Sequence, residues 1–110
     1  MKELPAKIFD IKPGSVEYIL ALKEQINRDL SKVGNYEFIT ENSFPKDWIN
    51  LFSEIIKKLT ENELNQLLYV VDLPENWSED LRQSESPYVS LAEAILQREW
   101  QKVYFRKMFS

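Results

Sequence analysis

The shortage of glycine and proline constrains the fold of this chain more than any other feature of its sequence. Its 110 residues include two glycines, Gly14 and Gly34, and five prolines. All-β folds need such residues at many turns, whereas a few long helices need them only near helix ends. A chain of this length suits one domain with one core. We therefore predict an all-α, single-domain bundle of four to five helices over residues 1–110.

Apolar residues recur at helical spacing in four segments, and local signals mark where these segments begin. Ser15 is a candidate N-cap, Thr60 with Glu63 matches a capping box, and Pro87 suits a first helical position. In the first segment the charged residues, including Asp29, fall largely outside the apolar face. The predicted long helices span residues 15–33, 45–59, 61–72 and 87–108.

The remaining segments are predicted to connect these helices. Residues 1–14 form an extended lead-in, and residues 72–86 form an acidic connection. A minor two-stranded element near residues 7–11 and 36–40 stays open, because both segments show a weak apolar alternation. Two short strands alone are only marginally stable, which favours a loop anchored by aromatic residues at the second segment.

The absence of cysteine and histidine narrows the chemistry open to the chain. It excludes disulfides, thiol and histidine nucleophile pairs, and nearly every kind of zinc site. The connection at residues 72–86 has no glycine and no alternating Asp/Asn pattern, so it does not match a calcium loop. We predict no enzyme activity, no cofactor and no metal site. The alternative is an enzyme that uses carboxylates and tyrosines, with Glu99 in a cleft beside Tyr18, Tyr69 or Tyr104.

Charge is distributed unevenly along a chain whose net charge is −4. Residues 59–97 carry eight acidic side chains against Arg82 alone, whereas residues 98–110 carry four basic side chains against Glu99. The helix predicted over residues 61–72 has no Lys or Arg, so it would repel phosphate, and we predict no nucleic-acid partner. With no apolar run of signal-peptide or bilayer-spanning length, we expect no membrane insertion and a cytoplasmic location.

A carboxylate interrupts the apolar stripe of the last predicted helix. Glu99 shares this stripe with Ile95 and Val103, and the stripe continues to Arg106. A buried carboxylate needs a partner, and Arg106 is one candidate, with Arg28 or a tyrosine hydroxyl as others. We therefore interpret Glu99 and Arg106 as buried polar residues that form a buried or rim ion pair.

The final turns of the same helix are apolar on almost every side. Phe105 and Met108 point away from the face that Ile95 and Val103 define, which is unusual for a helix on the surface of a monomer. Three outcomes are open: the helix becomes irregular near Tyr104, it buries a second face against another protein, or it lies on an anionic membrane or nucleic acid.

The leading functional interpretation is a non-catalytic protein–protein interaction domain, a self-associating regulator or adaptor. Its partner is a protein, and another copy of the chain, forming a homodimer, is one candidate. The alternative is an acidic inhibitor or immunity-type protein that covers a basic surface of a toxin or nucleic-acid enzyme with residues of the 72–86 connection. The candidate partner-binding residues of both surfaces are Trp100, Tyr104, Phe105, Met108, Phe109, Trp77, Glu79 and Asp80.

Overall fold

Four long helices match the predicted segments to within two residues at each end. They are α1 (Val16–Ser31), α2 (Pro45–Lys58), α3 (Glu61–Val71) and α5 (Pro87–Phe109). The computed structural model describes residues 16–38, 45–73 and 80–109, and of residues 16, 45, 46 and 107–109 it describes the backbone alone. Residues 80–82 are also helical. The all-α bundle predicted from the sequence is confirmed.

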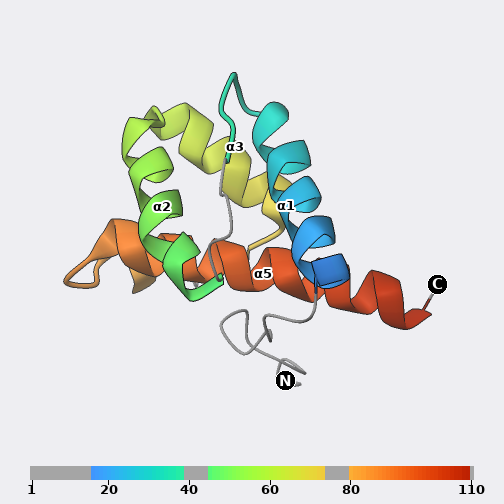
Figure 1. The fold of residues 1–110 in the computed structure, drawn as a ribbon. Helices are drawn as coiled ribbons and strands as arrows, with labels where there is room; N and C mark the ends of the chain where they lie inside the picture. The colour runs from blue at the N-terminus through green and yellow to red at the C-terminus, as the bar shows by residue number, and fades with distance from the viewer. Residues whose placement is uncertain (1–15, 39–44, 74–79, 110) are drawn as a thin grey trace.

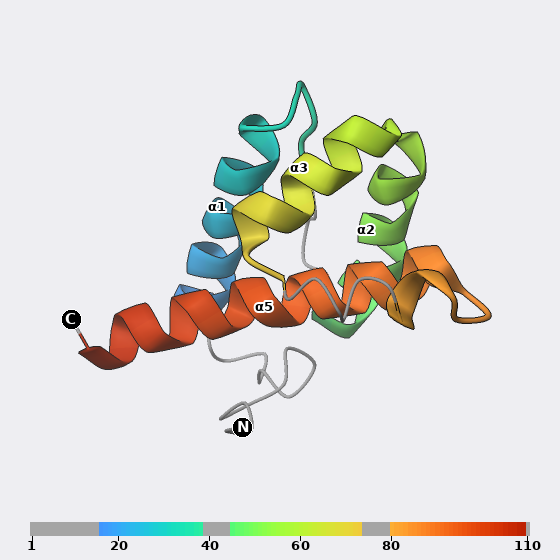
Figure 2. The same ribbon diagram turned by 180° about the vertical axis from the view of Figure 1, so that it is seen from behind.

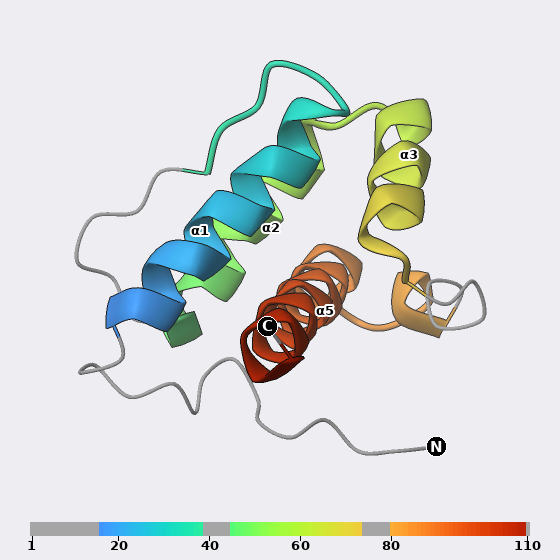
Figure 3. The same ribbon diagram turned by 90° about the vertical axis from the view of Figure 1, so that its right-hand side faces the viewer.

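Helix α5 is the element against which the other three helices pack. It runs beneath α1, α2 and α3, and its C-terminal turns extend past α1 (Figures 1 and 2). Seen along its axis, α1 and α2 lie on one side of α5 and α3 on the other (Figure 3). No helix among the described residues is long and apolar enough to cross a bilayer.

One hydrophobic core fills the space between these helices, and every helix contributes to it. Trp48, Phe52 and Ile56 of α2 are at most 1% exposed, which matches the helical spacing of apolar residues there. The largest contribution comes from α5, whose buried hydrophobic residues are Leu91, Ala92, Ile95, Leu96, Trp100 and Val103.

The loop after α1 is held in place by side-chain contacts. The Asn27 side chain accepts a hydrogen bond from the Phe38 N–H at 2.6 Å and donates one to the Phe38 carbonyl at 3.1 Å. The Phe38 ring then packs edge-on against Trp48 and Phe52. Residues 36–38 form no strand, which removes part of the two-stranded element considered above; residues 7–11 and 39–40 lie outside the described residues.

The corner between α2 and α3 has the capping box that the sequence predicts. Glu63 N–H donates to Thr60 Oγ1 at 3.1 Å, and Thr60 N–H donates to Glu63 Oε1 at 2.9 Å. The hydroxyl of Tyr36 donates to the same Glu63 carboxylate at 2.7 Å. A Cβ at Gly34 would lie 2.9 Å from the Tyr36 ring, so glycine allows the ring to approach the end of α1. Glu63 therefore both caps α3 and binds Tyr36 of the loop after α1.

Replacing Thr60 with alanine removes the hydroxyl that caps α3. We expect the Thr60→Ala variant to lose about 1 kcal/mol in its free energy of unfolding, the usual cost of losing such a cap. Urea denaturation followed by circular dichroism measures this loss. Thr60→Ser is the matched control, because it keeps the hydroxyl and should stay close to the parent protein. Equal stability of Thr60→Ala and Thr60→Ser would contradict the role of the cap.

Candidate functional site

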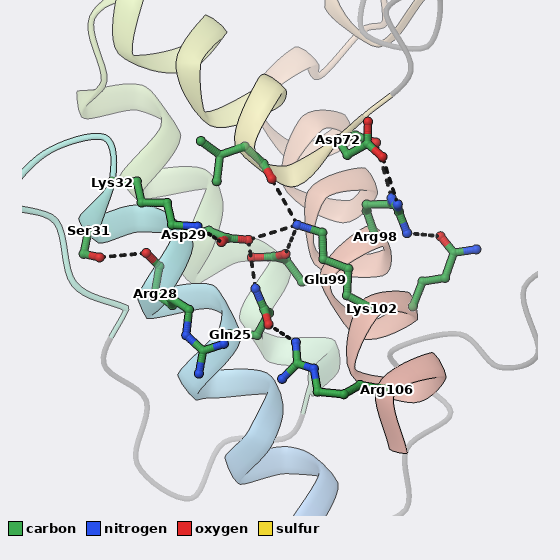
Figure 4. Close-up of polar contacts among 12 residues, drawn as sticks. Gln25, Arg28, Asp29, Ser31, Lys32, Asp72, Arg98, Glu99, Lys102 and Arg106 are labelled. Atoms are coloured by element: carbon green, nitrogen blue, oxygen red, sulfur yellow. Dashed lines mark hydrogen bonds and ion pairs between the residues drawn. The ribbon is translucent and has the colours of Figure 1, made fainter. Parts of the chain in front are cut away.

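Where α1 crosses α5, a group of polar side chains replaces apolar packing (Figure 4). We call this group the α1–α5 polar cluster; it comprises Gln25 and Asp29 from α1, and Glu99, Lys102 and Arg106 from α5. Glu99, Asp29 and Gln25 are only 1%, 2% and 5% exposed. Buried charged groups are rare unless they are paired, so this cluster is the most unusual part of the core.

Helical spacing places these side chains on facing surfaces. Gln25 and Asp29 are four residues apart, so they lie one turn apart on the same face of α1. Glu99, Lys102 and Arg106 follow one another at spacings of three and four residues, which aligns them along one face of α5. The crossing of the two helices then brings the two rows together.

Lys102 is the cation at the centre of the cluster. Its Nζ lies 3.2 Å from Asp29 Oδ2 and 3.5 Å from Glu99 Oε1, and it donates to the Val70 carbonyl at 3.1 Å. At 3.5 Å the contact with Glu99 is not a hydrogen bond, so Glu99 Oε1 is buried without a hydrogen-bond partner among the described residues. One ammonium group thus connects α1, α3 and α5.

Gln25 extends the cluster toward the surface. Its Nε2 donates to Asp29 Oδ2 at 3.2 Å, and its Oε1 accepts a hydrogen bond from the Arg106 guanidinium. On the other side of Asp29, Lys32 Nζ lies 3.8 Å from Oδ1, but the Lys32 side chain is 56% exposed. Water screens such an exposed charge, so Lys102 is the stronger electrostatic partner of Asp29.

The pKa values of the two buried carboxyl groups are shifted in opposite directions. Burial raises the pKa of Glu99 to about 9, and the adjacent Asp29 adds to this effect through a hydrogen bond and its negative charge. Burial also raises the pKa of Asp29, but hydrogen bonds from Glu99 and Gln25, together with the charge of Lys102, outweigh burial and bring this pKa below 3.8. Both shifts favour a proton on Glu99 beside an ionised Asp29 carboxylate.

The structure places the two predicted buried polar residues differently. Glu99 lies in the core, whereas Arg106 is exposed and its guanidinium binds Gln25. Seven residues separate Glu99 from Arg106, about two helical turns, and Lys102 occupies the position between them. Asp29, which the sequence places largely outside the apolar face of its helix, is the carboxylate that meets Glu99. No local signal in the sequence indicated this contact, because the crossing of two distant helices brings Asp29 and Glu99 together.

The aromatic residues of the last helix divide between the core and the surface. Trp100 is 5% exposed, and its ring meets those of Tyr18 and Tyr104 edge-on at centroid distances of 5.5 and 5.9 Å. The side chain of Phe105 is 41% exposed, with its ring centroid 6.0 Å from that of Tyr104. Helix α5 continues to Phe109, which excludes the alternative that it becomes irregular near Tyr104.

The other predicted partner-binding residues are described only in part. Met108 and Phe109 occupy the last turn of α5, and their side chains lie outside the described residues. Asp80 is exposed, whereas Trp77 and Glu79 lie outside the described residues.

Three basic residues near the C-terminus, Arg98, Lys102 and Arg106, have partners within the chain itself. Arg98 forms an ion pair with Asp72 at 3.2 Å and donates to Gln101 at 2.9 Å. Lys102 and Arg106 belong to the α1–α5 polar cluster described above. The acidic and basic parts of the sequence therefore complement each other inside one chain, at the Arg98–Asp72 contact between the end of α3 and α5.

The described residues show no group of side chains suited to a metal centre. Among them, no three acidic, histidine or cysteine side chains lie close enough to bind a metal ion. Tyr69, one of the tyrosines considered for a pocket with Glu99, is 86% exposed, whereas Glu99 is buried in the core. The chain matches no protein-family model, and neither curated proteins nor solved structures match it.

Removing the Lys102 ammonium leaves Asp29 and Glu99 in the core without their cation. We expect Lys102→Met to lose about 3 kcal/mol in its free energy of unfolding at pH 7, because breaking a buried ion pair leaves an uncompensated charge. Lys57→Met is the matched control, since Lys57 pairs with Glu54 at 3.0 Å on the exposed face of α2. This control should change stability by less than about 0.5 kcal/mol.

Urea denaturation of both variants measures these losses. Equal stability of the two variants would contradict a central role for Lys102.

Proposed function

We propose that the chain is a non-catalytic protein-interaction domain that binds its partner through the C-terminal turns of α5. The observation that carries this proposal is the exposed Phe105 ring beside Tyr104, on a helix end that extends past α1 (Figure 1). Exposed aromatic side chains of this kind are common anchors in protein interfaces, because they bury a large rigid area at low entropic cost.

A second copy of the chain is the partner we propose. Attraction between an acidic surface and a basic tail would be one way to hold two copies together, but Arg98 and Lys102 are already paired within the chain. The contact between copies would therefore depend mainly on apolar burial around Phe105, with Arg106 exposed at its edge. The cytoplasmic location stays a prediction.

The acidic inhibitor is the weaker candidate. Asp72 is 82% exposed and Asp80 is also exposed, which suits a surface for a basic partner. However, the Asp72 carboxylate already pairs with Arg98, which reduces the negative charge it would present to such a partner.

Replacing Phe105 with glutamate places a charge in the proposed contact surface. We expect light scattering of the parent protein to show a mass above that of the 13.1 kDa chain, falling toward it on dilution. Phe105→Glu should weaken association by at least about tenfold, because burying a phenylalanine ring contributes more than 1.4 kcal/mol. Leu51→Glu is the matched control, since Leu51 of α2 is 42% exposed and lies outside α5.

A parent protein that stays monomeric at every concentration would overturn self-association. Equal weakening by both variants would show that Phe105 is not its anchor.

A further inference from the structure

The α1–α5 polar cluster has two buried carboxyl groups and one central cation. Asp29 from α1 and Glu99 from α5 are 2% and 1% exposed, and Figure 4 shows their carboxyl groups facing each other beside the Lys102 ammonium. If both carboxyls were ionised, this buried group would carry an excess negative charge. Buried net charge is costly, and a single retained proton removes it.

The other charged groups near the cluster do not supply a second buried cation. From α1, Lys32 approaches only Asp29, at 3.8 Å, and is 56% exposed. From α5, Arg98 binds Asp72 and Arg106 binds Gln25, and neither contacts Glu99 in the contacts described. Helix α3 contributes only the uncharged Val70 carbonyl, to Lys102, and no described hydrogen bond or ion pair joins α2 to Glu99.

We propose that Asp29 and Glu99 share one proton that holds α1 against α5, and that losing this proton loosens the contact between the two helices. The contact between α1 and α5 then weakens in alkaline solution. This inference does not depend on the proposed interaction surface, because it concerns groups inside a single chain.

The direction of the pH effect follows from the Glu99 carboxyl. Its pKa is raised from 4.5 to about 9 in the folded protein. Below pH 4.5 both the folded and the unfolded chain hold this proton, so the stabilisation is fully present. Between pH 4.5 and about pH 9 only the folded chain holds this proton, so the free energy of unfolding falls steadily as pH rises. The stabilisation by the proton is lost by about pH 9. Asp29, whose pKa is lowered, contributes in the opposite sense, and its stabilisation is lost in strong acid.

The most direct test follows the carboxyl carbons of the unmodified chain by ¹³C NMR during a pH titration. We expect the Glu99 carboxyl to titrate far above the range of the other glutamates. In Asp29→Asn it should titrate at lower pH, because the negative charge that opposes its ionisation is gone. A Glu99 carboxyl that titrates together with the exposed glutamates would overturn the proposal.

A second test compares the pH dependence of unfolding. Glu99→Gln keeps a donor for Asp29 but cannot ionise, so between pH 6 and pH 8 the unfolding constant of the parent should rise about tenfold per pH unit relative to this variant. Glu93→Gln is the matched control, because Glu93 is an exposed glutamate of the same helix. It should follow the parent at every pH.

Parallel pH profiles for the parent and Glu99→Gln would overturn the shared proton. If Glu99→Gln does not fold, the NMR titration of the unmodified chain still decides the question.

Discussion

The arrangement of this bundle depends on one lysine that serves two buried carboxyl groups. Lys102 Nζ reaches Asp29 on α1, Glu99 on its own helix and the Val70 carbonyl at the end of α3. Apolar packing alone tolerates small rotations and shifts between helices, whereas such directed polar contacts are satisfied in one arrangement only. The polar cluster therefore fixes how α1 and α3 lie on α5, while the surrounding apolar residues supply most of the burial.

This arrangement connects the interior of the protein to the surface proposed for binding. Helix α5 carries Glu99 and Lys102 in its middle and the exposed Phe105 one turn beyond. Trp100 follows Glu99 directly in the sequence, and its ring packs against those of Tyr18 of α1 and Tyr104. A change in how α1 packs on α5 would therefore reach the aromatic residues at the end of α5 through contacts that already exist.

Much of the fold could be predicted from the sequence because its signals are local. Helical spacing, the Thr60–Glu63 capping box and Pro87 depend on residues close in the chain, and they located the helices to within two residues. The polar cluster could be predicted only in part, since Asp29 and Glu99 meet through the crossing of two distant helices. The apolar stripe identified Glu99 as unusual, but nothing local indicated Asp29 or Lys102 as its partners in place of Arg106.

A double-mutant cycle at Asp29 and Glu99 tests this account most directly. Asp29→Asn and Glu99→Gln each leave one carboxyl group for Lys102, whereas the double variant leaves the partly buried ammonium without either carboxyl partner. We predict from urea denaturation at pH 7 that the double variant loses about 0.5–3 kcal/mol more than the sum of the single losses, the size of coupling found for residues in one network. Additive losses would contradict the claim that one lysine and two carboxyls act as a unit.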